Sequence, residues 1–313
     1  MSAPADRTGF GALHPGVSFL LFFLVIAISV ITMHPVLLGC SAAGALLLCI
    51  QLKGRRATAR LLAGLVPLAL FAAAINALFN HQGVTVIGSL WGQPLTREAL
   101  IYGMLLALML IAVLLWFTSY NLVFTSEKFF ALFGRIIPSF ALVTTMALRF
   151  VPHYLRQARR IAAAQRGLGD TAGRDPGSGS LATRLRSSFA ILSILTSWAL
   201  ESAIDTADSM RARGYGTGRR SVYSPFRFTD RDAVICVVML ICTALVSSTL
   251  VTGVLSAQYL PRFLLNQGAA ALSSPLRAAL IAGAYAAFGL LCLLPALLNV
   301  GEELAWRISR STI

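Results

Sequence analysis

The chain has 313 residues, of which 57% are hydrophobic and only 12% are charged, yet it carries a formal net charge of +14. Its mean hydropathy is +0.76. A soluble domain has about 25% charged residues, so this composition excludes an ordinary soluble protein and predicts an integral membrane protein.

Apolar windows recur along the chain, and each is long enough to cross roughly 30 Å of hydrocarbon as an α-helix. We predict six spans, near 17–33, 35–50, 61–79, 99–118, 232–253 and 277–298. The first two are short and separated only by His34 and Pro35, so a count of five or seven stays open. The expected fold is an all-α integral membrane protein.

The distribution of basic residues predicts the orientation of these spans. With a cytoplasmic N-terminus, 23 of the 26 Lys and Arg residues fall on the cytoplasmic side, and only Arg97, Arg262 and Arg277 lie outside. Cytoplasmic loops carry such an excess of basic residues. We therefore expect a multi-pass protein of the cell membrane with both termini in the cytoplasm.

Three regions follow from this topology: an N-terminal transmembrane region (1–118), a cytoplasmic region (119–231), and a C-terminal transmembrane region with a tail (232–313). The five cysteines lie in or beside apolar spans and show no C-x-x-C spacing. We interpret them as core or lipid-facing residues rather than disulfide partners or metal ligands.

The reactive residues of the chain do not indicate a catalytic role. The chain has two lysines, Lys53 and Lys128, and neither lies in the glycine-rich loop of a nucleotide-binding site. The four histidines form no H-E-x-x-H pair, and no G-x-S-x-G sequence is present. We predict a non-catalytic chain with no cofactor or metal of its own.

The cytoplasmic region holds sixteen basic and seven acidic residues. It is too long for a connector and too apolar for a disordered tail, so we expect it to fold. Its periodicity predicts two long amphipathic helices, joined by a flexible linker at 167–180 that contains five glycines.

The first of these helices has a weakly apolar stripe and a basic stripe opposite to it. The apolar stripe consists of Phe140, Thr144, Ala147, Val151, Leu155, Ala158 and Ala162. The basic stripe consists of Arg149, His153, Arg156 and Arg160. Pro138 suits the start of the helix, and Pro152 predicts a kink in its middle. Gly167 and Gly169 can end it as left-handed caps.

The second helix repeats the pattern. Its apolar stripe consists of Leu185, Phe189, Leu192, Thr196, Ala199, Ala203, Ala207 and Met210. An acidic stripe of Glu201, Asp205 and Asp208 marks another face, and Gly214 and Gly216 should stop the helix. The acidic stripe either pairs with the basic stripe where the two helices cross or forms a solvated face.

The end of the second helix, "DSMRARGYGTGRR" at 208–220, concentrates four arginines and three glycines. An arginine fork can bind carboxylates or backbone carbonyls at the edge of a groove, and the small Ala212 and Gly214 let a helix end enter one. Met210 can adapt to an apolar pocket. Alternatively, the cations only suit the helix macrodipole, satisfy the orientation rule or lie on anionic lipid. Nucleic acid is not an expected partner, because the basic residues are mixed with a wide apolar face.

The run "ESAIDTADSMRARGYGTGRRSVYSPFRFTDRD" at 201–232 resembles the characteristic stretch of the transmembrane T component of energy-coupling factor (ECF) transporters. The segments 75–88, 114–152 and 191–210 are also similar to this family, so the resemblance covers most of residues 75–232.

This resemblance implies a transporter with several subunits. Two cytoplasmic ABC-type ATPases, which hold ATP and Mg, supply the energy. A small membrane S component binds a vitamin or similar micronutrient, and the T component joins the two. The long cytoplasmic helices are then coupling helices, whose Ala-Arg-Gly-like ends dock on the ATPases.

Carried over to this chain, the second docking motif is Ala212, Arg213 and Gly214, with Met210 and Arg211 beside it. The first motif departs from the family pattern. It falls in the run Ala164, Gln165, Arg166, Gly167, Leu168 and Gly169. Either Leu168 stands where the family has arginine, or Arg166 and Gly167 take that role earlier in the chain.

Two other functions stay open. A self-sufficient secondary transporter or channel would usually have charges or inverted repeats within its spans, which these spans largely lack. A lipid-bound scaffold would bind no ATPases. At the outer boundary of the third span, Asn80 and His81 are interpreted as a capped turn or, alternatively, as substrate or metal ligands.

Overall fold

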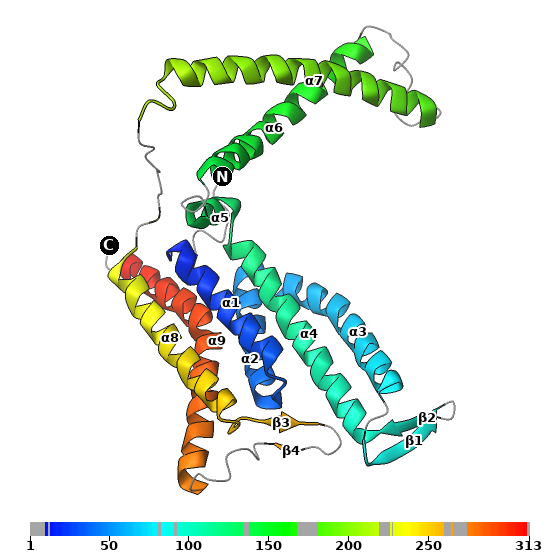
Figure 1. The fold of residues 1–313 in the computed structure, drawn as a ribbon, viewed down its shortest axis with the longest axis vertical. Coiled ribbons are helices and arrows are strands. Elements are labelled where there is room, and N and C mark those ends of the chain that lie inside the picture. The colour runs from blue at the N-terminus through cyan, green and yellow to red at the C-terminus, as the bar shows by residue number, and fades with distance from the viewer. Residues whose placement is uncertain are drawn as a thin grey trace. The chain divides into compact units, whose positions relative to one another are not determined.

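The computed structural model describes residues 10–11, 13–80, 83–90, 93–133, 138–167, 181–218, 226, 228–259, 264–265 and 274–311. The chain divides into two compact units. The membrane unit comprises Met1–Phe129 and Phe226–Ile313, and the inserted unit is residues 130–225. Most of the described chain is helical in both units (Figure 1).

The membrane unit contains one long helix for each predicted span. These helices are α1 (Pro15–Ile31), α2 (Pro35–Lys53), α3 (Arg55–Phe79), α4 (Arg97–Val123), α8 (Asp230–Val251) and α9 (Ser274–Ser311). Among the described residues, α2, α3, α4, α8 and the Pro275–Leu304 part of α9 are long and apolar enough to cross a membrane. The helix α1 is apolar but has only 17 residues. The chain is thus an α-helical, multi-pass membrane protein, and a sixth span at α1 stays a prediction.

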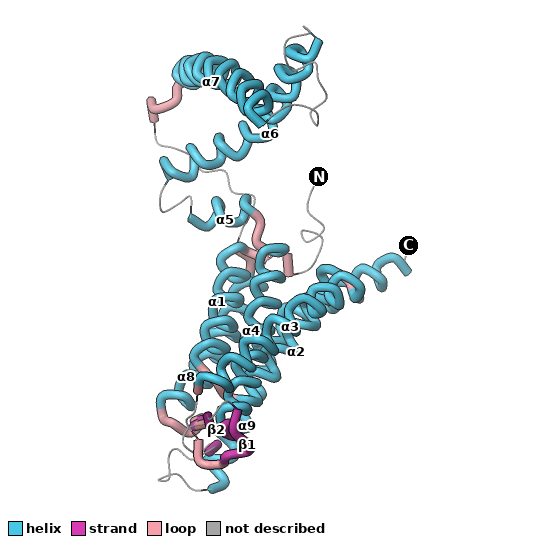
Figure 2. The backbone as a smooth tube through the Cα atoms, turned by 90° about the vertical axis from the view of Figure 1, so that its right-hand side faces the viewer, coloured by secondary structure: helices cyan, strands magenta, loops and turns pink. Residues whose placement is uncertain are grey.

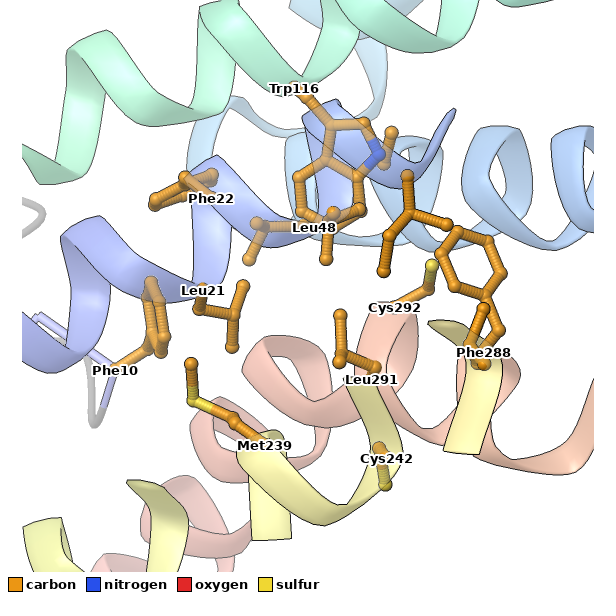
Figure 3. Close-up of a cluster of buried hydrophobic side chains, with 14 of the residues drawn as sticks. Phe10, Leu21, Phe22, Leu48, Trp116, Met239, Cys242, Phe288, Leu291 and Cys292 are labelled. Carbon is orange, nitrogen blue, oxygen red and sulfur yellow. The ribbon is translucent and has the colours of Figure 1, made fainter. Parts of the chain in front are cut away.

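The membrane helices pack around α4 and α2. The helix α4 contacts α1, α2 and α3, while α2 contacts α9 and α9 contacts α8 (Figure 2). Side chains from five helices meet in one buried cluster, which includes Phe22 of α1, Leu48 of α2, Trp116 of α4, Met239 of α8 and Leu291 of α9 (Figure 3). The first and last spans of the sequence therefore share one core.

Small residues allow two pairs of these helices to approach closely. A Cβ atom added at Gly44 of α2 would lie 2.7 Å from the carbonyl oxygen of Cys292 on α9. A Cβ atom at Gly103 of α4 would lie 2.8 Å from the carbonyl oxygen of Ala73 on α3. Lipid chains are as apolar as leucine, so backbone proximity of this kind is a main source of attraction between membrane helices.

A chain of hydrogen bonds also links α4, α2 and α1 in the buried core. The Trp116 indole N–H donates to the Ser41 hydroxyl at 3.0 Å, and the hydroxyls of Ser41 and Ser29 are 2.7 Å apart. The Ser29 hydroxyl donates to the carbonyl of Val25 at 2.7 Å. With the Ser29 proton used in this way, Ser41 is the donor to Ser29. Each buried hydroxyl thus both donates and accepts.

Two short antiparallel pairs of strands join the helices. The strands β1 (Val86–Leu90) and β2 (Gln93–Thr96) form a hairpin between α3 and α4. The strands β3 (Ala257–Gln258) and β4 (Leu264–Leu265) pair between α8 and α9. These strands were not predicted, because they have only two to five residues and no clear alternation of apolar and polar residues.

The five cysteines are all free. Cys49, Cys242 and Cys292 are buried, and Cys40 and Cys236 are partly buried. The prediction that they are packing residues is confirmed.

The inserted unit consists mainly of two long helices, α6 (Pro138–Gly167) and α7 (Leu181–Ala212), which contact each other. The short helix α5 (Ser126–Phe133) leads from the membrane unit into it. As predicted, α6 begins at Pro138, and it continues through Pro152. The linker between the helices lies outside the described residues after Gly167.

Replacing Gly44 with leucine should weaken the contact between α2 and α9, since the added side chain would overlap the backbone of Cys292. Overpacking of this kind costs about 1–3 kcal/mol, which thermal unfolding of the detergent-solubilised chain would measure. Gly39→Leu in the same helix is the control, because Gly39 is exposed and an added Cβ meets nothing within 4 Å. Equal stability of the two variants would contradict the proposed close contact.

Candidate functional site

The predicted end of α7 is held by a set of backbone hydrogen bonds. The helix ends at Ala212, and Gly214 follows with φ of 79°, in the left-handed region that favours glycine. The Gly214 N–H donates to the Arg211 carbonyl at 2.9 Å, and the Tyr215 N–H donates to the Met210 carbonyl at 3.0 Å. This pattern is a Schellman motif, which uses carbonyls that a helix end leaves unpaired. The helix stop predicted at Gly214 is confirmed.

A second turn follows this cap directly. Gly216 has φ of 93°, and both the N–H and the hydroxyl of Thr217 bond to the Gly214 carbonyl, the hydroxyl at 2.7 Å. Tyr215 was missed as a cap residue. Its position after a glycine, with Met210 five residues earlier, is the apolar pattern that often accompanies a Schellman motif.

The side chains at this helix end face outward. Arg211, Ala212, Arg213 and Gly214 are exposed, and Met210 is partly buried. Arg211 lies 3.4 Å from Asp208, one turn earlier on the same exposed surface. Within the described part of the chain, Arg213 has no ion pair, so its guanidinium fork is available to a partner.

The acidic and basic stripes do not pair in the described residues. Arg149, Arg156 and Arg160 of α6 are exposed, as are Glu201, Asp205 and Asp208 of α7. Asp208 pairs with Arg211 of its own helix, and the Arg156 side chain donates to the Pro152 carbonyl at 3.2 Å. The acidic stripe could pair with the basic stripe or form a solvated face, and in the structure it forms a solvated face.

Aromatic rings form the contact between α6 and α7 instead. The ring centroids of His153 and Trp198 are 5.2 Å apart, and those of Tyr154 and Trp198 are 5.8 Å apart with an interplanar angle of 86°. By its spacing His153 belongs to the basic stripe, but in the structure its ring packs against Trp198. Trp198 was not among the predicted contact residues, although it is the only tryptophan of residues 119–231.

Both long helices keep apolar faces exposed. Large exposed side chains on α6 are Val143, Leu148, Val151 and Leu155. On α7 they are Leu185, Phe189, Leu192, Ile194, Leu200 and Ile204. Large apolar side chains exposed in such numbers indicate a contact with another protein or with a membrane.

The first predicted motif is only partly described. The helix α6 ends at Gly167, with Ala164 exposed and Gln165 partly buried. The side chain of Arg166 and both Leu168 and Gly169 lie outside the described residues. The choice between the two registers of this motif stays open.

The turn after α3 shows no metal site in the described part of the chain. Asn80 follows the last residue of α3, and its N–H donates to the Asn76 carbonyl at 2.9 Å. His81 lies outside the described residues. No group of three or more His, Cys, Asp or Glu residues that could hold a metal occurs among those that are described.

These features define a class of protein: a multi-pass α-helical membrane protein with an inserted pair of long helices, one of which ends in an exposed arginine-glycine cap. The family model CbiQ, described as "Cobalt transport protein", matches residues 12–224. The match covers more than half of the chain and includes the α7 cap, so the chain belongs to this family.

Curated relatives agree with this assignment. The chain is 33% identical over 180 residues to the energy-coupling factor transporter transmembrane protein EcfT of Bacillus selenitireducens, a match that covers 54% of this chain and 66% of the relative. It is 28% identical over 194 residues to EcfT of Lactococcus lactis, covering 58% and 70%. The first match thus spans slightly less than two thirds of that relative. The predicted resemblance to the T component of ECF transporters is confirmed.

Replacing Gly214 with alanine should loosen the end of α7, because a left-handed conformation costs an L-residue about 1–2 kcal/mol. We expect faster amide hydrogen exchange at residues 210–217, with the middle of α7 unchanged. Gly218→Ala is the control, since Gly218 lacks a left-handed φ and an added Cβ meets nothing within 4 Å. If both variants exchanged equally, the cap would not depend on Gly214.

Proposed function

We propose that this chain is the coupling subunit of an ECF-type ABC importer. In this proposal it joins two ABC-type ATPase subunits to a small S component in the cell membrane. The chain is itself non-catalytic, and ATP and Mg bind to the partner ATPases. Both of its termini lie in the cytoplasm, on the same side as the inserted unit.

The observation that carries this proposal is the α7 cap, in which an exposed Arg213 lies directly before the left-handed Gly214. The Schellman bonds fix the backbone on both sides of Arg213, so little conformational entropy is lost when the helix end is bound. The guanidinium can then donate to a carboxylate or to backbone carbonyls at the edge of an ATPase groove.

The proposed mechanism is mechanical. ATP binding closes the paired ATPases, and the groove on each ATPase moves the helix end docked in it. The helices α6 and α7 carry this shift to the S component. Their exposed apolar faces, with side chains such as Val151 and Phe189 more than half exposed, support a contact with another membrane protein.

The transported substrate would be a micronutrient, such as a vitamin or a metal ion. The family description names cobalt transport, and the relatives are named only as energy-coupling factor transporter proteins. In the proposed assembly the S component selects the substrate, so no residue of this chain needs to touch it.

Replacing Arg213 with glutamate should prevent the α7 end from docking. Loss of an arginine that anchors an interface costs about 2 kcal/mol or more, which corresponds to a roughly thirtyfold weaker interaction. We expect the ATPases to be lost from affinity pull-downs of the solubilised complex, and ATP-driven uptake by membrane vesicles to fall accordingly.

The matched control is Arg149→Glu, since Arg149 is an exposed arginine of the same unit outside both docking motifs. It should insert, co-purify and transport like wild type. Normal uptake with Arg213→Glu would contradict the docking role. Uptake by the purified chain alone would instead favour a self-sufficient transporter.

A further inference from the structure

Lys128 is a buried lysine close to the point where the chain enters the inserted unit. Its residue is only 1% exposed, and its ammonium group donates to the carbonyls of Gly11 at 2.7 Å and Val123 at 2.9 Å. Lysine is almost never fully buried unless its charge is compensated. We call Gly11, Val123 and Lys128 the junction clasp.

The two carbonyls come from different parts of the membrane unit. Val123 is the last residue of α4, where the helix dipole presents negative partial charge and an unpaired carbonyl. Gly11 belongs to the segment before α1. One cation therefore joins the end of α4, this N-terminal segment and the first turn of α5.

The N-terminal segment is in turn bound to α8 and α9. The Phe10 N–H donates to the Asn299 side chain at 3.0 Å, and the His14 N–H donates to the Asp232 carboxylate at 3.1 Å. A force on Lys128 is therefore opposed along two routes. One runs through Gly11 and the N-terminal segment to α8 and α9, and the other runs through Val123 to α4.

Aromatic packing supports the same junction. The ring of Phe124, directly after α4, stacks on Tyr120 with centroids 5.0 Å apart and lies 5.7 Å from Phe19 of α1. Phe129 meets Phe124 edge to face at 6.5 Å. Phe129 is also the last residue of this part of the membrane unit, and the inserted unit begins at the next residue.

We propose that the junction clasp holds the start of α5 within the membrane unit, just before the chain enters the inserted unit, and that Lys128 is a positioning residue for energy coupling. This inference rests on the proposed function. When ATPase closure displaces the long helices, an α5 held at Lys128 gives that displacement a fixed attachment in the membrane unit. Without the clasp, α5 itself moves, and the displacement is not passed on.

The test compares Lys128→Met with wild type, using Lys53→Met as the matched control. Methionine keeps an unbranched stem without the charge, and Lys53, the chain's other lysine, is exposed at the end of α2. Lys128→Arg is a second variant that keeps a cation able to reach the carbonyls, and we expect it to restore part of the function.

The first readout is amide hydrogen exchange of the solubilised chain. Hydrogen bonds to a charged group are worth about 1.5–3 kcal/mol, so their loss should speed local exchange about tenfold or more. In Lys128→Met we expect this at residues 10–14 and 120–133, with α2 and α9 unchanged. Unchanged exchange, or a uniform rise across the membrane unit, would overturn the anchor.

The second readout is transport by the full complex in proteoliposomes. In Lys128→Met the ATPases should still co-purify and hydrolyse ATP within about twofold of wild type. We expect the substrate taken up per ATP hydrolysed to fall about tenfold, in proportion to the increased local opening at the clasp. An unchanged ratio, or an equal fall in hydrolysis and uptake, would overturn the coupling role.

These readouts separate the inference from the proposed function. If ATPases fail to co-purify with wild type, the proposed function is wrong and the coupling role falls with it. The exchange measurement still decides whether Lys128 anchors α5. If wild type couples normally and Lys128→Met does too, only the inference about Lys128 is wrong.

Discussion

Helices within a bilayer gain no hydrophobic energy by burying apolar side chains against one another, because lipid chains are equally apolar. This constraint decides which contacts hold the membrane unit together. Its helices depend on close backbone approach at Gly44 and Gly103, and on the hydrogen bonds that run from Trp116 through two serines. The many leucines and valines of the spans fill the space between these contacts but do not determine which helices pair.

In the described part of the chain, buried charge occurs near the ends of helices. Among the described residues, the buried side chains with a formal charge are Glu98, Lys128 and Asp232. Each one lies in the first turn of a helix and bonds to backbone groups: Glu98 accepts from Thr85, Asp232 accepts from Thr229 and His14, and Lys128 donates to two carbonyls. These three buried charges therefore fix connections between segments of the chain.

Much of this architecture could be predicted from local sequence signals. Span positions follow from the length of apolar runs, and the end of α7 follows from Gly214, because only glycine adopts a left-handed conformation without strain. Contacts that depend on distant residues could not be predicted in this way. In the sequence, nothing distinguishes Lys128 from a surface lysine. Its burial depends on the fold, which places Gly11 beside it. Likewise, His153 fits a basic stripe by spacing, but the crossing of two helices places it against Trp198.

A helix transmits a displacement only if its ends are fixed and its interior is stiff. The far end of α7 is fixed by the Schellman bonds at Gly214, and the contact of α7 with α6 is made by the rigid rings of Trp198 and Tyr154. The chain that leads to α6 is fixed at Lys128. In the proposed assembly, losing the Gly214 cap would let the end of α7 fray, so that a bound ATPase would act on loose backbone. Losing Lys128 would, in the same proposal, leave docking intact and free α5 to move. In this proposal the α7 cap and Lys128 should therefore fail in different ways, the cap by loss of binding and Lys128 by loss of coupling.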